Sequence, residues 1–154
     1  MKRFAALFPT TLALAILLPG CGAKPVEGVT EARITLPAVK DRPGAAYFTL
    51  TGGETENRLL TVTSPQAIRV ELHDTMMKDG LMSMQAIEGG VAVPKGGKVA
   101  FEPSGKHAML YDIAPSVKVG GTIKLNFTYA NGRTIEVDAK VNPPGQASDS
   151  GHAH

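Results

Sequence analysis

The sequence predicts an all-β domain, built as a Greek-key β-sandwich or barrel from many short strands. Glycine (17 residues) and proline (11 residues) are frequent, which suits short strands and turns better than long helices. Apolar and polar residues alternate in several segments, and no segment has an extended apolar repeat of 3.6 residues, so we expect almost no helix. A chain of 154 residues has room for a single domain of ordinary size.

Nine strands are expected in close succession, which is typical of a sandwich or barrel. Residues 122–129 show the alternation clearly, because Ile123, Leu125 and Phe127 share one face. Asn131-Gly132 predicts a two-residue hairpin before the last strand. The expected strands are residues 32–36, 45–51, 58–64, 68–75, 82–87, 98–101, 107–112, 122–129 and 133–141.

The first twenty residues are interpreted as a targeting signal that is removed. Lys2 and Arg3 precede an apolar stretch over 4–18 that is too short to span a membrane comfortably. Leu18-Pro19-Gly20-Cys21 is similar to a bacterial lipobox, in which Cys21 becomes the lipidated N-terminus, although Pro19 is unusual there. The alternative is ordinary secretion without a lipid. We expect a periplasmic protein that contacts a membrane only through its anchor at Cys21.

The rest of the chain divides into three parts. Residues 21–28 are predicted to be a tether, residues 29–142 the β-sandwich domain, and residues 143–154 a disordered tail, because the tail lacks apolar residues to pack. The tail ends with His152 and His154. Imidazole suits Cu(II), so this His-x-His end is interpreted either as a mobile site that captures Cu(II) or as a solvated end with no role.

Composition excludes several function classes. Without Lys2 and Arg3, 16 − 2 = 14 basic residues face 14 acidic residues, so nucleic acid is not an expected partner. Cys21 is the only cysteine, which excludes disulfides and cysteine-ligated zinc or iron–sulfur sites within the domain. The sequence contains no G-x-S-x-G, H-E-x-x-H or phosphate-loop motif, and we expect no enzyme activity.

Methionine and histidine residues are concentrated in one part of the domain. Five of the six methionines share a window with His73 and His107, the only histidines outside the tail. Packing a small sandwich does not require this clustering. The five methionines are Met76, Met77, Met82, Met84 and Met109.

Strand geometry predicts how the first part of this cluster is arranged. If Asp79-Gly80 forms a two-residue turn, Thr75 lies opposite Met84 in the hairpin. His73 and Met84 are then diagonal neighbours on one face, with Cβ atoms within about 8 Å. The other face of this strand should point into the core, and it carries Ile68, Val70 and Leu72.

The second part is His107-Ala108-Met109. Residues two apart on a strand point the same way and lie roughly 6.5 Å apart, so His107 and Met109 can reach one ion while Ala108 and Leu110 face the core. Imidazole together with the soft, uncharged thioether favours Cu(I) over zinc, magnesium or calcium. A blue-copper site is excluded because it needs a cysteine thiolate.

The remaining polar and sulfur-containing residues of the window are interpreted more simply. Met76 and Met77 are expected to fill the core. Met82 shares the face of Met84, and its alternatives are a spare metal ligand and a packing residue. The acidic residues near the site are expected to be solvated, namely Glu71, Asp74 and Asp79.

These residues resemble the periplasmic copper chaperone family known as PCuAC. The family signature is a histidine, a methionine after ten intervening residues, and His-x-Met after about twenty-one. Ten residues separate His73 from Met84, and twenty-two separate Met84 from His107, one more than usual. We place the extra residue in the turn over 102–106, where an insertion costs little. The matching stretches are Val70-Glu71-Leu72-His73, Gly80-Leu81-Met82-Ser83-Met84, Pro94-Lys95-Gly96-Gly97 and His107-Ala108-Met109-Leu110.

The resemblance implies a cupredoxin-like sandwich and Cu(I) ligation by His73, Met84, His107 and Met109. It also implies delivery of copper to a partner, such as a Sco-type protein or the copper subunit of cytochrome c oxidase. Two alternatives stay open at this point. One is a copper-buffering protein without a dedicated recipient, and the other is a metal-free surface lipoprotein.

Overall fold

The computed structural model describes residues 24–78 and 80–146. The targeting signal, Cys21, Asp79, His152 and His154 lie outside the described residues. Among the described residues, no helix is long and apolar enough to cross a membrane.

The described chain forms ten strands and no helix, so the all-β prediction is confirmed. All nine expected strands are present, with no end displaced by more than four residues, and β6 was missed because three residues are too few to show alternation. The strands are β1 (Gly28–Thr35), β2 (Gly44–Thr51), β3 (Asn57–Thr63), β4 (Ala67–Lys78), β5 (Leu81–Ala86), β6 (Val91–Val93), β7 (Lys98–Phe101), β8 (Lys106–Ile113), β9 (Thr122–Tyr129) and β10 (Thr134–Asn142).

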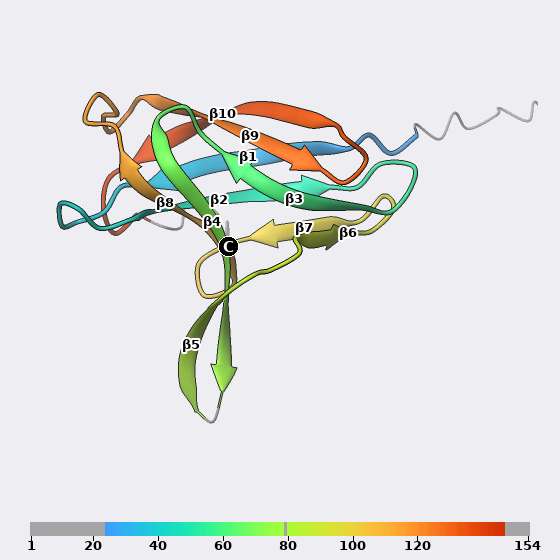
Figure 1. Ribbon diagram of the computed structural model, residues 1–154, viewed down its shortest axis with the longest axis horizontal. Helices are drawn as coiled ribbons and strands as arrows, with labels where there is room; N and C mark the ends of the chain where they lie inside the picture. Colours follow the sequence, from blue (N-terminus) through green and yellow to red (C-terminus); the bar gives the residue numbers. More distant parts are fainter. Residues whose placement is uncertain (1–23, 79, 147–154) are drawn as a thin grey trace, which may run out of the picture.

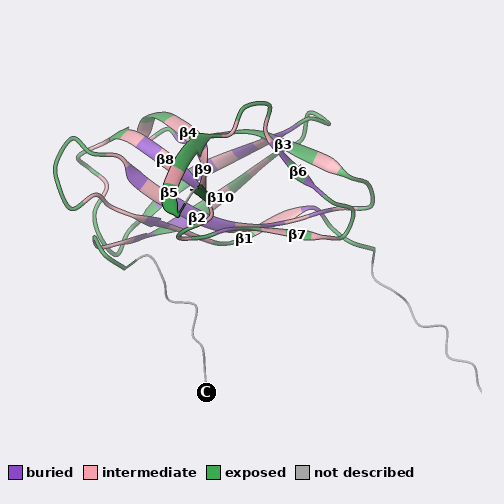
Figure 2. Ribbon diagram, turned by 90° about the horizontal axis from the view of Figure 1, so that it is seen from below, coloured by how far each residue is buried: buried purple, intermediate pink, exposed green. Residues whose placement is uncertain are grey.

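The strands form one continuous sheet that folds over on itself into two layers (Figures 1 and 2). Nine strands follow the order β5-β4-β8-β2-β1-β10-β9-β3-β6, and β7 also pairs with β2. The pairing of β1 with β10 is parallel, and the other pairings in the described chain are antiparallel. The strand β5 therefore lies at one edge, beside β4.

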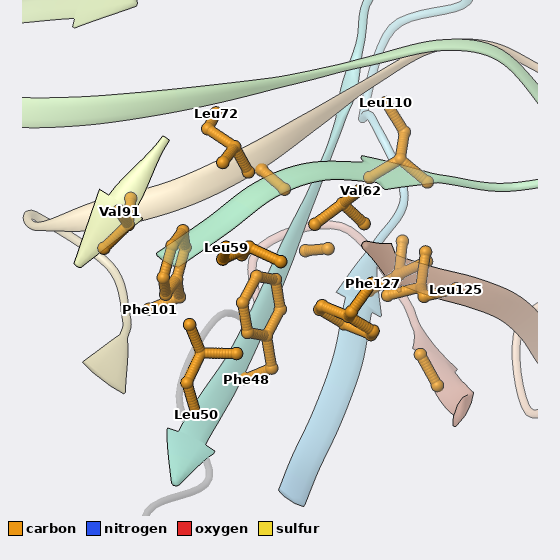
Figure 3. Packing of buried hydrophobic residues seen from close by; sticks show 14 of the residues in the cluster. Phe48, Leu50, Leu59, Val62, Leu72, Val91, Phe101, Leu110, Leu125 and Phe127 are labelled. Atoms are coloured by element: carbon orange, nitrogen blue, oxygen red, sulfur yellow. The ribbon is translucent and has the colours of Figure 1, made fainter. Parts of the chain in front are cut away.

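Aromatic side chains occupy the centre of the core between the layers (Figure 3). The ring of Phe48 stacks on Phe101 with centroids 4.2 Å apart and meets Phe127 edge to face at 4.8 Å. Offset stacking and edge-to-face contacts are the preferred geometries of aromatic pairs. All three rings come from inward-facing positions of β2, β7 and β9, so these contacts hold the strands together.

On the inner face of β4, one of the three residues expected in the core is exposed. Leu72 is buried, but Ile68 on the same face of β4 is 82% exposed. Val70, between them, is partly buried and packs against the core. The exposure of the inward-facing side chains of β4 therefore rises from Leu72 to Ile68, because the start of this strand extends beyond the core. Alternation shows which residues share a face, but it does not show how much of that face another layer covers.

The turn before the last strand is also longer than predicted. The Tyr129 N–H donates to the Arg133 carbonyl at 2.9 Å, and the Gly132 N–H donates to the Tyr129 carbonyl at 3.0 Å. Ala130, Asn131 and Gly132 thus form the turn, with Gly132 at φ 83°. A three-residue loop with glycine in the left-handed position is the next commonest hairpin after the two-residue type.

Both predicted flanking segments contact the domain where the structure describes them. Glu27, in the expected tether, is buried and accepts a hydrogen bond from Asn57 Nδ2 at 2.6 Å. At the start of the expected tail, the Gln146 carbonyl accepts a hydrogen bond from the Thr35 hydroxyl at 3.2 Å. Contacts with the β-sandwich therefore reach Glu27 and Gln146, which flank residues 29–142.

Candidate metal centre

The candidate centre lies where a hairpin leaves the sandwich. The first part of β4 pairs with β8, and its last part pairs with β5. His73 and Asp74 belong to both ladders, so three strands meet at this point. Beyond it, the β4–β5 hairpin projects from the body of the molecule, as Figure 1 shows. We call the projecting part, Thr75–Lys78 of β4 with β5, the arm.

The register of the arm agrees with the prediction from Asp79-Gly80. Thr75 pairs with Met84, and His73 pairs with Ala86. Gly80 has φ 77°, a left-handed conformation that glycine adopts without strain. His73 and Met84 are therefore diagonal neighbours on one face, as the turn requires.

The two histidines lie directly opposite each other on adjacent strands. His73 of β4 pairs with His107 of β8, and the ring centroids are 6.0 Å apart with 26° between the planes. A metal ion bound by an imidazole nitrogen lies about 3 Å from the ring centroid, so two rings that share one ion have centroids about 5 to 6 Å apart. The observed spacing fits a shared ion.

His107 and Met109 lie on the outer face of β8, as predicted. Ala108 and Leu110, which alternate with them, are fully buried in the core. Met109 pairs across the ladder with Glu71. The structure thus places His73, His107, Met109 and Met84 on one outer face of β4, β5 and β8.

Burial is uneven across this face. His107 is 7% exposed and His73 is partly buried, whereas the Met84 side chain on the arm is 52% exposed. Cross-strand neighbours lie on both sides of His73, but β5 is an edge strand with a neighbour on one side only. The histidines therefore form a sheltered side of the cluster, and Met84 forms its open side.

A backbone hydrogen bond sets the orientation of His107. Its Nδ1–H donates to the Gly105 carbonyl at 3.0 Å, and a carbonyl can only accept, so the proton of the neutral ring is on Nδ1. The lone pair on Nε2 is then available for a metal. Fixing one ring nitrogen by a backbone carbonyl is the usual way in which proteins orient a metal-binding histidine.

Glu71 orients the other histidine. Nε2–H of His73 donates to Glu71 Oε2 at 3.2 Å, which leaves the lone pair of the neutral ring on Nδ1. Among the described residues, this Nδ1 is buried and has no hydrogen-bond partner. A buried polar atom without a partner is costly, and a metal ion would satisfy it.

Glu71 is the residue that sequence reasoning missed, because it was expected to be solvated. The hydrogen bond from His73 lowers the pKa of its carboxyl below the usual value, with further lowering by the Tyr111 hydroxyl and the Arg69 guanidinium. Arg69 Nη1 also lies 2.6 Å from Glu71 Oε1. The Glu-x-His spacing, which puts both side chains on one strand face, was a signal that could have identified it.

Tyr111 contacts the thioether sulfur of Met109. The Tyr111 hydroxyl donates to Met109 Sδ at 3.8 Å, and the Tyr111 ring stacks under the Arg69 guanidinium, 4.1 Å from the ring centroid. A thioether has two lone pairs, so one remains for a metal. Glu71, Arg69 and Tyr111 therefore form a polar frame beside the cluster.

The interpretation of Met76 and Met77 as core residues is wrong. Both side chains are exposed, like those of Leu81 and Met82. The arm extends past the opposing layer, so its methionines have no core to enter (Figure 1).

The donor set of the candidate centre suits soft metal ions better than hard ones. The described residues contain no group of three or more His, Cys, Asp or Glu side chains that could hold an ion. Two imidazoles and two thioethers are neutral and include soft sulfur, a set that suits Cu(I) and binds harder ions weakly.

Fold and site together define a class: a single β-sandwich domain with a histidine–methionine cluster at the base of a projecting hairpin. The LpqE-like family of lipoproteins matches residues 28–141. The chain belongs to this LpqE-like family.

Two relatives extend the similarity. The chain is 25% identical over 163 residues to "Putative lipoprotein Lxx21020" of Leifsonia xyli subsp. xyli, covering 92% of this chain and 93% of the relative. It is 26% identical over 98 residues to "Uncharacterized protein RP573" of Rickettsia prowazekii, covering 63% of this chain and 54% of that protein.

Solved structures of PCuAC domains share the fold, which is the cupredoxin-like sandwich implied by the sequence resemblance. The copper-bound PCuAC domain from PmoF2 superposes with a TM-score of 0.62 at 19% identity, covering 75% of this chain and 92% of the domain. Apo-DR1885 from Deinococcus radiodurans gives a TM-score of 0.58 at 25% identity, covering 96% and 99%. Its Cu(I) form gives 0.59 at 26% identity, covering 78% of each chain. The predicted resemblance to PCuAC is thereby confirmed.

Proposed function

We propose that this protein is a copper chaperone whose cargo is Cu(I). The ion is coordinated by His73, His107, Met84 and Met109. The observation that carries the proposal is the pair of facing histidines, each held so that one ring nitrogen keeps a free lone pair. Met84 and Met109 lie on the same face and supply the soft donors that distinguish Cu(I) from Cu(II) or zinc. Similarity to Cu(I)-DR1885 supports this cargo.

The uneven burial of the site suits transfer. Neutral ligands release an ion without the protonation that a bound thiolate would require. Met84 stands on the exposed edge of the cluster, so a ligand from a partner can replace its sulfur while the sheltered histidines still hold the ion. Four protein ligands leave no open position for a substrate, which favours carriage over catalysis.

Location and recipient belong to the same proposal. The lipoprotein names of the family and of the Leifsonia relative support an exported protein anchored at Cys21, and we propose that it resides in the periplasm. We propose a Sco-type protein or the copper subunit of cytochrome c oxidase as recipient. Deletion of the gene should lower oxidase activity when copper is scarce, whereas copper sensitivity alone would favour buffering.

Cu(I) affinity tests the cargo directly. The full chain is titrated anaerobically against a coloured Cu(I) chelator and compared with a Met84→Ala/Met109→Ala variant. Loss of an outer-shell partner of a metal ligand costs 10- to 100-fold in affinity, so loss of two ligands should weaken binding by about 100-fold or more.

Met76→Ala is the matched control, since Met76 is an exposed methionine on the other face of the arm. Tight one-to-one binding by the wild type and by this control, with weak binding by the double variant, supports the proposal. Equal binding by all three chains would remove Met84 and Met109 from the site and with them the proposal. No binding by any of them would leave a metal-free lipoprotein as the alternative.

A further inference from the structure

The arm carries large apolar side chains that are exposed and do not pack against the core. None of the six residues of β5 belongs to the hydrophobic core, and the strand is drawn almost entirely in the colour of exposed residues in Figure 2. An exposed apolar patch of this kind marks an interaction site more often than a structural need. Its members are Met76, Met77, Leu81, Met82 and Met84.

Three of the four methionines lie together on one face. Met77 and Met82 are direct cross-strand partners, so their Cβ atoms are about 5 Å apart. Met84 is two residues from Met82 on the same face, roughly 6.5 Å along the strand. Met76 is paired with Ser83 and lies on the opposite face.

The exposure of these three side chains leaves their sulfurs accessible. Met77 is 67% exposed and Met82 is 56% exposed, so both thioethers can be reached from solvent. A methionine has three rotatable side-chain bonds, so three sulfurs whose Cβ atoms are this close can converge on one ion. Thioether donors alone select Cu(I) among the common biological cations.

We propose that the thioethers of Met77, Met82 and Met84 form a second Cu(I) site, an entry and exit site on the arm. It shares Met84 with the histidine-containing site. Without imidazole, and with ligands that are more than half exposed, it binds Cu(I) more weakly than that site. The identity of the ion rests on the proposed function, but the juxtaposition of the three thioethers does not.

Sharing Met84 gives the ion a continuous path. Met77 lies four residues from His73 on β4, about 13 Å away, and Met84 pairs with Thr75 midway between them. Cu(I) leaves the arm by exchanging the Met77 and Met82 sulfurs for the two imidazoles and Met109, while Met84 stays bound. The ion keeps its charge, every ligand is neutral, and no proton or electron moves.

The test isolates the arm by removing part of the histidine-containing site. In a full-length His107→Ala/Met109→Ala background, residual binding of Cu(I) is measured by competition, and Ag(I), a redox-inert substitute, is followed through the methionine methyl NMR signals. Weak residual binding is expected, with shifts of the Met77, Met82 and Met84 signals. Adding Met77→Leu/Met82→Leu should weaken this residual binding at least tenfold.

Adding Met76→Leu to the same background is the matched control and should change nothing. The proposal is overturned if the background chain binds no ion, if Met77→Leu/Met82→Leu leaves its affinity unchanged, or if Met76→Leu weakens it equally. The wild type is titrated in parallel. A wild type that binds no Cu(I) refutes the proposed function, whereas tight wild-type binding with any of those three results refutes the arm site alone.

Discussion

A His107→Ala chain is expected to lose at least two orders of magnitude in Cu(I) affinity while it remains folded. The substitution removes the imidazole that faces His73 at 6.0 Å and leaves its Gly105 carbonyl partner in a turn. Loss of outer-shell partners alone costs up to 100-fold, so loss of a direct ligand should cost at least as much. Competition with a Cu(I) chelator measures the affinity, and urea unfolding measures the stability.

Gln85→Ala is the control for this experiment, because Gln85 is exposed and lies next to Met84 on the other face of β5. It should retain wild-type affinity. A His107→Ala chain that unfolds would show that His107 is a structural residue. A folded chain with unchanged affinity would remove His107 from the site.

The largest effect on stability is expected for Phe48→Ala. Phe48 is 1% exposed and contacts both Phe101 and Phe127, so truncation leaves a cavity between the layers. Such substitutions cost about 3–5 kcal/mol, which is a large part of the free energy of unfolding of a small domain. Urea denaturation should show a lower midpoint with the slope little changed.

Two further variants make that result specific. Phe48→Leu retains most of the apolar volume and should cost less than Phe48→Ala. Val39→Ala, at an exposed position, should change the free energy of unfolding by no more than about 0.5 kcal/mol. A Phe48→Ala chain with nearly wild-type stability would mean that the aromatic cluster is not the centre of the core.

Local sequence was enough to predict half of the site. Gly80 and the residues around it fix the hairpin register that makes His73 and Met84 neighbours. The two-residue period of a strand places His107 and Met109 on one face. Both inferences use residues close together in the chain, where backbone geometry leaves few choices.

The meeting of the two halves could not be predicted from local pattern. His73 faces His107 because β4 pairs with β8 in a particular register, and these strands are separated in the chain by the arm, β6 and β7. From the sequence, only the resemblance to the PCuAC family assigned all four residues to a single metal site. The role of Glu71 was missed for the same reason, because it depends on how the His73 ring is turned.

Errors in the predicted core have a shared physical origin. Ile68, Met76 and Met77 were all assigned to the interior, and all are exposed. Each lies on a part of β4 that extends beyond the core. An apolar residue in a strand has the same appearance in the sequence whether another layer covers it or not.

X-ray absorption spectroscopy of the chain loaded with one equivalent of Cu(I) tests the central claim most directly, since it counts the atoms bound to copper. Ligation by His73, His107, Met84 and Met109 predicts two nitrogen and two sulfur neighbours. A Met84→Ala/Met109→Ala variant that also carries Met77→Leu/Met82→Leu, and so lacks the thioethers of both proposed sites, should lose the sulfur signal at this loading. Copper surrounded only by nitrogen and oxygen in the wild type would contradict the account, and so would a sulfur signal that survives in the variant.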